Sequence, residues 1–143
     1  MPSPPTPSPR FAWKPSLRIG VPQIDAQHEA LFERAARFDA AFLAGEPSKR
    51  LEELFAFLAG YALEHFVDEE QYMRKVGYPQ YASHVQEHAE FKRRLRSLVP
   101  QWDSEGESQA LLTALLGFLD SWLIGHVGKS DQAVGEFVKG RGA

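Results

Sequence analysis

The segment His65-Phe66-Val67-Asp68-Glu69-Glu70 places an imidazole and a carboxylate four residues apart, inside a run with helical periodicity. At about 100° per residue, His65 and Glu69 project from the same face of a helix, one turn apart. Leu54 and Leu58 recur on roughly the same stripe, so the polar pair points into the core. Because a buried carboxylate without a partner is unfavourable, we expect a positive charge to meet Glu69 there.

The histidines of the chain share this placement. All five fall on the apolar stripes of expected helices: His28, His65, His84, His88 and His126. A single histidine on an apolar face is usually an ordinary core residue, but five together indicate a common role. His84 and His88 form a second pair one turn apart, able to bind one ion from one face. Because the chain has no cysteine, any metal must be held by nitrogen and oxygen.

Asp131 follows His126 at a spacing of five. On a regular helix this offset turns the aspartate about 140° away from the histidine, so the helix must end or widen for both to reach one centre. Gly125 and Gly128 make such a distortion easy. Taken alone, Asp131 would be read as a surface residue or as the cap of a following helix.

The elements that must position these residues are helices. Periodicity and stop signals predict helices from about residue 22 to 44, 47 to 76, 80 to 99 and 108 to 126, with a short tail helix from about 130 to 138. Pro100 is expected to stop the third helix. Residues 11 to 23 form an extended arm with Trp13 as its anchor. The predicted fold is all-α, an antiparallel up-and-down four-helix bundle with an N-terminal extended arm and a short C-terminal helix.

Composition bounds the remaining possibilities. A length of 143 residues favours one domain, over residues 11–143, preceded by a disordered Pro/Ser-rich tail at residues 1–10. A net charge of −3 gives no basic field for nucleic acid or an anionic membrane. The first residues lack the apolar run of a signal peptide, and no window approaches 18 consecutive apolar residues. We therefore expect a cytoplasmic protein with no nucleic-acid partner and no membrane insertion.

Four linked motifs resemble the hemerythrin family, specifically its single-domain bacteriohemerythrins. They are Ile24-Asp25-Ala26-Gln27-His28, the His65 to Glu70 segment with Met73, His84-x-x-x-His88, and Trp122-Leu123-Ile124-Gly125-His126 followed by Asp131. Their order and spacing cover the chain from about Trp13 to Asp131. The resemblance implies that residues 11–143 are a hemerythrin-like di-iron domain.

The resemblance also implies a ligand set, with two iron ions joined by an oxo or hydroxo bridge. His84, His88 and His126 would bind one iron, His28 and His65 would bind the other, and Glu69 and Asp131 would bridge both. Counting the two bridging carboxylates and the bridging oxygen, the iron bound by three histidines has six ligands and the iron bound by two histidines has five. Dioxygen would therefore bind at the open position of the second iron.

Around that position the resemblance places an apolar oxygen pocket formed by Leu31, Phe66, Trp122, Leu123 and Val127. These residues would also serve as ordinary packing of the bundle. Lys129 stands where we expect another apolar residue, and its amine either reaches the pocket or points outward.

Three polar residues near the motifs have two open readings. Asp25, Gln27 and Asp68 could orient the ligand imidazoles, or they could be solvated residues of the helix surface.

The expected function is reversible dioxygen binding, as an oxygen carrier, store or local supplier and not as an enzyme, with an oxygen-consuming enzyme as the recipient. Two ferrous ions, two carboxylates and one hydroxide leave a net charge of about +1, which favours reversible binding over oxygenation. One alternative is a di-iron redox enzyme or sensor that handles peroxide or nitric oxide. Another is a structural bundle whose histidines are incidental or bind zinc.

Overall fold

All regular structure in the described residues is helical. The computed structural model describes residues 11–45, 48–106 and 108–142, so the tail predicted at residues 1–10 lies outside the described part. The elements are a 3-10 turn η2 (Pro15–Leu17), α1 (Pro22–Leu43), α2 (Ser48–Val76), α3 (Tyr81–Glu105), α4 (Gln109–Ser121), a π-helix η3 (Trp122–Ser130) and α5 (Asp131–Gly142). The prediction of an all-α fold is confirmed.

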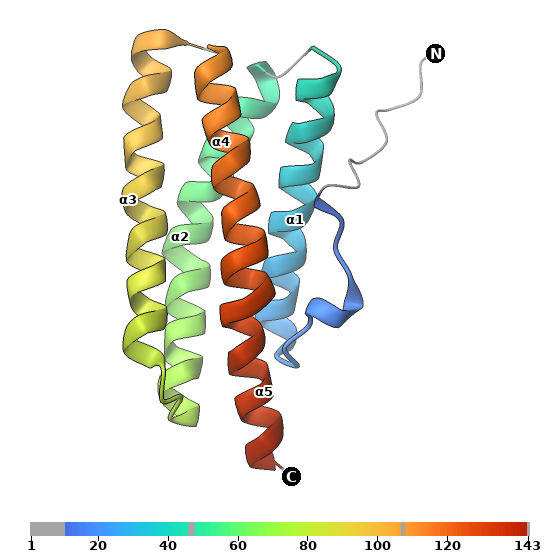
Figure 1. Ribbon diagram of the computed structural model, residues 1–143, viewed down its shortest axis with the longest axis vertical. Helices are drawn as coiled ribbons and strands as arrows, with labels where there is room; N and C mark the ends of the chain where they lie inside the picture. The colour runs from blue at the N-terminus through green and yellow to red at the C-terminus, as the bar shows by residue number, and fades with distance from the viewer. Residues whose placement is uncertain (1–10, 46–47, 107, 143) are drawn as a thin grey trace.

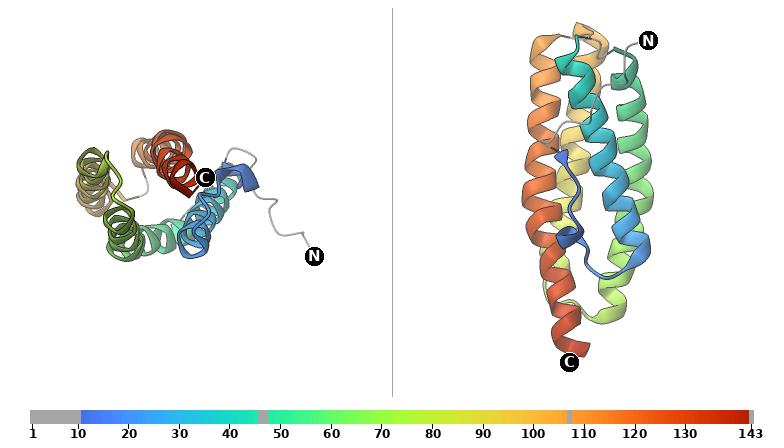
Figure 2. Two further views of the ribbon diagram at one scale, coloured as in Figure 1. Left: turned by 90° about the horizontal axis from the view of Figure 1, so that it is seen from below. Right: turned by 90° about the vertical axis from the view of Figure 1, so that its right-hand side faces the viewer.

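The helices form an up-and-down bundle. α1 and α3 run in one direction and α2 and α4 in the other (Figure 1). Contacts join α1 to α2, α2 to α3, α3 to α4 and α4 back to α1, which closes the bundle around a common interior. α4, η3 and α5 follow one another as one continuous rod, as the side view in Figure 2 also shows. The predicted tail helix is therefore present as the end of this rod.

Local signals in the sequence set most helix boundaries. α1 and α2 are followed by Gly45 and Gly77, whose φ angles of 77° and 69° a residue with a side chain rarely adopts. At the end of α2 the N–H of Tyr78 donates to the carbonyl of Met73 at 2.9 Å, which satisfies one of the last free carbonyls. Ser108 caps α4 by accepting a hydrogen bond from the N–H of Leu111 at 3.1 Å.

The predicted stop at Pro100 is wrong. α3 continues through this proline to Glu105 and ends at Gly106, whose φ is 64°. A proline inside a helix removes one backbone hydrogen bond and crowds the preceding turn. Pro100 lies on the exposed side, and beyond it Trp102 stacks on Phe55 of α2 with ring centroids 4.9 Å apart. This packing outweighs the local signal.

The N-terminal arm lies against the bundle (Figure 2). Trp13 packs edge-on against Phe32 of α1 with ring centroids 5.4 Å apart. Phe11 and Ile19 are buried more deeply, at 2% and 4% exposure. Leu17 also packs against the core, so the arm is held by several apolar side chains, of which the predicted anchor Trp13 is one.

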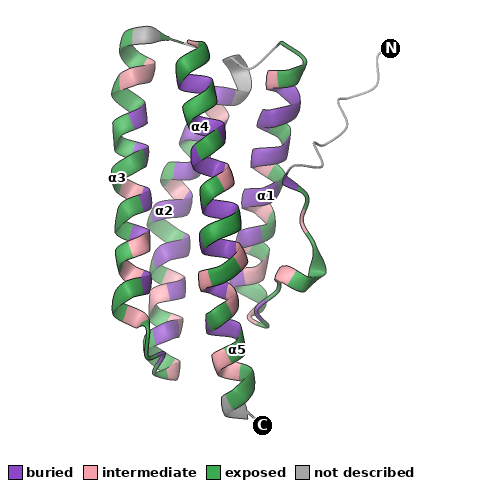
Figure 3. Ribbon diagram, in the orientation of Figure 1, coloured by how far each residue is buried: buried purple, intermediate pink, exposed green. Residues whose placement is uncertain are grey.

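Two apolar clusters enclose the middle of the bundle, and Figure 3 shows the buried positions along the inward faces of the helices. The larger cluster includes Phe38, Leu51, Leu54, Leu111 and Leu115, from the end of α1 and the beginnings of α2 and α4. The smaller cluster contains Met73, Tyr78 and Val134, from the other end of the bundle. Buried polar side chains occupy the region between them.

The rod α4–η3–α5 is also the most apolar part of the chain. Residues Gln109–Gly140 are long and apolar enough to cross a membrane by length and composition, and the most apolar 18-residue window among them has a mean hydropathy of 1.6. Within the most apolar window of this rod, 56% is buried inside the bundle. A core helix passes the same test, so packing against the other helices accounts for this composition.

The bundle predicts a contrast between two leucines of α2. Leu58 is 0% exposed and Leu63 is 72% exposed. We expect Leu58→Ala to lower the free energy of unfolding by about 2–5 kcal/mol, because it leaves a cavity in the core. The matched control Leu63→Ala should change it by less than about 0.5 kcal/mol. Urea denaturation of both variants at equal metal content measures the difference, and equal effects would contradict the packing described.

Candidate metal centre

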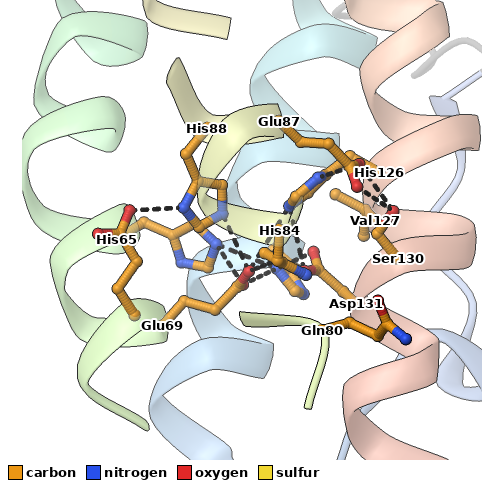
Figure 4. A network of polar contacts seen from close by, with 12 residues as sticks. His65, Glu69, Gln80, His84, Glu87, His88, His126, Val127, Ser130 and Asp131 are labelled. Carbon is orange, nitrogen blue, oxygen red and sulfur yellow. Dashed lines mark hydrogen bonds and ion pairs between the residues drawn. The ribbon is translucent and has the colours of Figure 1, made fainter. Parts of the chain in front are cut away.

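Seven buried polar side chains converge in the middle of the bundle (Figure 4). They are His28 from α1, His65 and Glu69 from α2, His84 and His88 from α3, His126 from η3 and Asp131 from α5. None is more than 2% exposed. The structure thus brings together every residue that the sequence singled out as a candidate ligand.

Glu69 divides its two carboxylate oxygens between two groups of imidazoles. Oε1 contacts Nε2 of His84 and lies 3.1 Å from Nε2 of His88. Oε2 lies 3.0 Å from Nε2 of His65 and 3.4 Å from Nε2 of His28. The carboxylate therefore faces both groups at once.

Asp131 divides its oxygens in the same way. Oδ1 lies 3.0 Å from Nε2 of His84 and 3.1 Å from Nε2 of His126, while Oδ2 lies 3.0 Å from Nε2 of His28. Two buried carboxylates that each face two groups of nitrogens have the arrangement of bridging ligands.

The two groups differ in size. Three imidazoles, of His84, His88 and His126, surround Glu69 Oε1, and their ligand atoms lie within 4.8 Å of one another. Two imidazoles, of His28 and His65, form the second group with both carboxylates, within the same limit. The centre is therefore asymmetric in its nitrogen ligands.

The donor atoms fit metal ions better than they fit one another. Within the described part of the chain, both oxygens of Asp131, Oε2 of Glu69 and Nε2 of His126 are buried without a hydrogen bond of normal geometry, although nitrogens and oxygens approach to 3.0–3.5 Å. Ligands at roughly 2.1 Å from a shared ion lie about 3 Å apart when they occupy neighbouring positions. The set of five imidazoles and two carboxylates matches two ions bridged by carboxylates and does not match one four-coordinate zinc site.

The π-helix η3 places Asp131 beside His126. The backbone N–H of Asp131 donates to the carbonyl of His126, five residues earlier, which is the hydrogen bond of a widened turn. This turn removes most of the angular offset that a regular helix would impose on a spacing of five. Of the two options left open by the sequence, the helix widens and does not end, and α5 continues from Asp131.

Carboxylates outside the centre orient two of the imidazoles through hydrogen bonds to their Nδ1 atoms. Nδ1–H of His88 donates to Glu70 at 2.7 Å, and Nδ1–H of His126 donates to Glu87 at 2.9 Å. Glu87 also accepts a hydrogen bond from Oγ of Ser130 at 2.7 Å. With Nδ1 protonated, the lone pair of Nε2 is directed into the centre, where a metal would need it.

A neutral amide orients His65. Nδ1–H of His65 donates to Oε1 of Gln27 at 2.6 Å, and Nε2 of Gln27 donates to Asp68 at 2.8 Å. Gln27 and Asp68 thus orient the imidazole of His65, one of the two roles considered for them. Asp25 does not, because its carboxylate accepts the backbone N–H of Ile19 at 2.7 Å instead.

Sequence reasoning missed Glu70, Glu87 and Ser130 as partners of this centre. Helical periodicity places the two glutamates at the edge of the polar face, where carboxylates are usually solvated, and Glu87 is in fact 42% exposed. Their roles depend on which helix lies opposite, so no spacing within one helix reveals them. The one available signal is that each directly adjoins a candidate ligand, Glu70 beside Glu69 and Glu87 beside His88.

Burial and charge act strongly on the protonation of the centre. Burial alone would raise the pKa of the Glu69 carboxyl, but the close approach of the imidazole nitrogens of His126, His28 and His84 holds it well below its usual value. Burial works against the charged imidazoles, yet Asp131 and Glu69 raise the pKa of His28 and of His84 to about 9. Metal-free protein therefore keeps protons where metal ions would bind.

His65 behaves differently from its neighbour His28. Burial lowers the pKa of His65 more than Glu69 raises it. The two Nε2 atoms lie 3.1 Å apart, so a protonated His28 donates to a neutral His65. Two imidazole nitrogens this close, both aimed at the carboxylates, again fit a shared cation.

The five residues expected to line the pocket are all buried. Leu31, Phe66 and Val127 are 0% exposed, and Trp122 and Leu123 are at most 7% exposed. Phe66 stacks on His88 with ring centroids 4.0 Å apart, and Trp122 stacks on His126 at 3.8 Å. Lys129 is exposed, the second of the two alternatives considered for it.

Comparisons with known proteins agree with this arrangement. Residues 19–138 match the family model described as the hemerythrin HHE cation binding domain. A myohemerythrin of Riftia pachyptila is 31% identical over 126 residues, covering 85% of this chain and 87% of the relative. A bacteriohemerythrin of Stenotrophomonas maltophilia is 30% identical over 130 residues, covering 90% and 82%.

A bacteriohemerythrin of Clostridium acetobutylicum is 26% identical, covering 85% of this chain and 96% of the relative. No solved structure gives a significant match. The family model spans all seven converging side chains, and the relatives are matched over most of their length. The chain belongs to the hemerythrin family.

Proposed function

We propose that the protein binds dioxygen reversibly at a non-haem di-iron centre and serves as an oxygen carrier, store or local supplier. The proposed ligands are the seven converging side chains, with Glu69 and Asp131 as bridges between the ions and an oxo or hydroxo group as a further bridge. A bound iron pair would supply the electrons and the open position that dioxygen requires.

The observation that carries the proposal is the division of both buried carboxylates between unequal groups of imidazoles. Oε1 and Oε2 of Glu69 face three and two histidines respectively. With both carboxylates shared, the two-histidine side has one protein ligand fewer and so leaves room for a small exogenous ligand. The relatives named as hemerythrins support the same choice of metal and ligand.

The chain itself contributes orientation and exclusion of water. Gln27, Glu70 and Glu87 hold three imidazoles in the tautomer that directs Nε2 inward. Phe66 and Trp122 cover the centre with aromatic rings. A dry pocket slows proton delivery, and loss of a reduced oxygen ligand needs protons.

The ligand charges favour binding over oxygenation. Five neutral imidazoles and two carboxylates offset less metal charge than a carboxylate-rich set does, so high oxidation states are less stabilised. The alternative is a di-iron redox enzyme or sensor for peroxide or nitric oxide. Peroxide turnover far faster than autoxidation would favour that alternative.

The proposal extends to surroundings and partners. A net charge of −3 favours neither nucleic acid nor an anionic membrane as a partner. We place the protein in the cytoplasm, without membrane insertion, where an oxygen-consuming enzyme would be the recipient of the gas.

Metal analysis and optical spectroscopy test the proposal directly. Protein purified from iron-replete cells should hold two irons per chain and show oxo-bridged charge-transfer bands that bleach on deoxygenation and return with air. A colourless protein with one metal or none per chain would falsify it.

Glu69 is the sharpest single test of the paired centre. We expect Glu69→Ala to reduce iron to one or fewer per chain and to abolish the charge-transfer bands, because it removes a bridge and a compensating charge. Glu64→Ala, an exposed position on the same helix, is the matched control and should keep both irons. Two coupled irons in Glu69→Ala would contradict the bridging role.

Protons and metal ions compete for the same atoms, which predicts a pH dependence. Asp131 and Glu69 raise the folded-state pKa of His28 and His84 to about 9, against burial, from an ordinary value of 6.5. Their ion pairs therefore stabilise metal-free protein fully below about pH 6.5, and this stabilisation is lost as the pH rises through 9. His65 has a lowered pKa and therefore destabilises the folded, metal-free protein, but only below about pH 6.5, where this histidine is protonated in the unfolded chain.

We thus expect metal-free protein to lose stability between pH 6.5 and 9, while iron-loaded protein, whose imidazoles carry no extra proton, does not. Urea denaturation across this range, with and without iron, measures both curves. Metal-free stability that stays flat or rises would contradict the protonation described.

A further inference from the structure

A tyrosine lies against the two-imidazole side of the centre. Tyr61 is one turn before His65 on α2, and the two rings stack with centroids 4.5 Å apart and an angle of 19°. Phe66 and Phe91 pack against the same tyrosine, at 5.4 and 5.9 Å. Tyr61 is therefore fixed by packing beside the group of ligands that leaves an open position.

The hydroxyl of Tyr61 is buried and has no hydrogen-bond partner among the residues that the structure describes. A cleft of about 230 Å³ between α1 and α2 reaches the residue, with Gln27, Phe57 and His65 among its walls, but the hydroxyl oxygen itself is not exposed there. The hydroxyl oxygen therefore lies on the side of Tyr61 that faces the interior of the bundle and not the cleft. A phenol has an ordinary pKa of about 10, so at neutral pH the Tyr61 hydroxyl carries a proton that it can donate.

A buried hydroxyl without a partner is unusual, since most buried polar atoms are paired. Phenylalanine would fill the same space without the loss of hydration that the phenol suffers. Trp122 of η3 also has a buried indole N–H without a hydrogen bond of normal geometry in the described part of the chain, and the indole lies beside the phenol. The phenol O–H is therefore a buried donor without an acceptor of its own among the described residues.

We propose that the Tyr61 hydroxyl donates a hydrogen bond to the small ligand held on the His28/His65 side of the centre, either dioxygen or a small anion such as azide. This inference rests on the proposed function, because it needs a ligand with an acceptor atom in the pocket. Polarity and donors around an open metal position decide which ligands are retained. Tyr61 is then a specificity-determining residue that favours ligands carrying negative charge and slows their release.

Tyr61→Phe tests the inference, because the variant keeps the ring and its stacking and removes only the donor. In the iron-loaded oxidised protein, azide titration followed in the visible region should give a dissociation constant about three- to tenfold higher than for wild type. In the reduced protein, the dioxygen dissociation rate constant measured by stopped flow should rise by a similar factor. The melting temperature of the metal-free variant should not fall, because no hydrogen bond within the protein is lost.

Tyr72→Phe is the matched control. This half-buried tyrosine of α2 packs in the smaller cluster at the end of the bundle, so its removal should leave azide and dioxygen binding unchanged. Equal ligand affinity and release in wild type and Tyr61→Phe would overturn the role of Tyr61 alone. Wild-type protein that binds neither ligand would overturn the proposed function and, with it, this inference.

Discussion

Two buried carboxylates shared between two groups of imidazoles are the constraint on which the rest of this structure depends. Glu69 and Asp131 are both 0% exposed. Removing two neighbouring anions from water is strongly unfavourable unless cations or protons lie close to them and compensate the charge. α1, α2, α3 and the rod α4–η3–α5 each meet this requirement by directing at least one imidazole inward. The apolar clusters on either side then exclude water, which strengthens these interactions further.

The π-helix shows how backbone geometry serves this constraint. A regular helix carrying His126 inward would carry Asp131 toward the surface, and ending the helix would cost the packing of α5. A widened turn keeps one rod, retains backbone hydrogen bonding through the His126 carbonyl, and turns Asp131 inward. Gly128 suits this turn, because a Cβ there would lie 3.2 Å from the carbonyl oxygen of Leu123. The irregularity is thus the means by which the second carboxylate reaches the centre.

The sequence predicted those features that periodicity within one helix determines. The inward stripes, the histidines on them and the glycine-marked helix ends follow from a repeat of 3.6 residues and from local backbone preferences. The continuation of α3 past Pro100 was not predictable, because it depends on Trp102 meeting Phe55 of another helix. The partners Glu87 and Gln27 were undetermined for the same reason. Which residue lies opposite which is a property of tertiary packing, and the spacing of residues along one helix does not contain it.

The hydrogen bonds to the Nδ1 atoms of the imidazoles make the two sides of the centre chemically unequal. His88 and His126 donate to the carboxylates of Glu70 and Glu87, which strengthens their Nε2 atoms as electron donors. His65 donates to the neutral amide of Gln27, and Nδ1 of His28 is buried without a partner in the described part of the chain. A metal ion on the three-imidazole side would thus receive more electron density from the proposed ligands than one on the two-imidazole side. An electron-rich ligand is drawn to the side with fewer and weaker donors, so ligand number and ligand strength favour the same position.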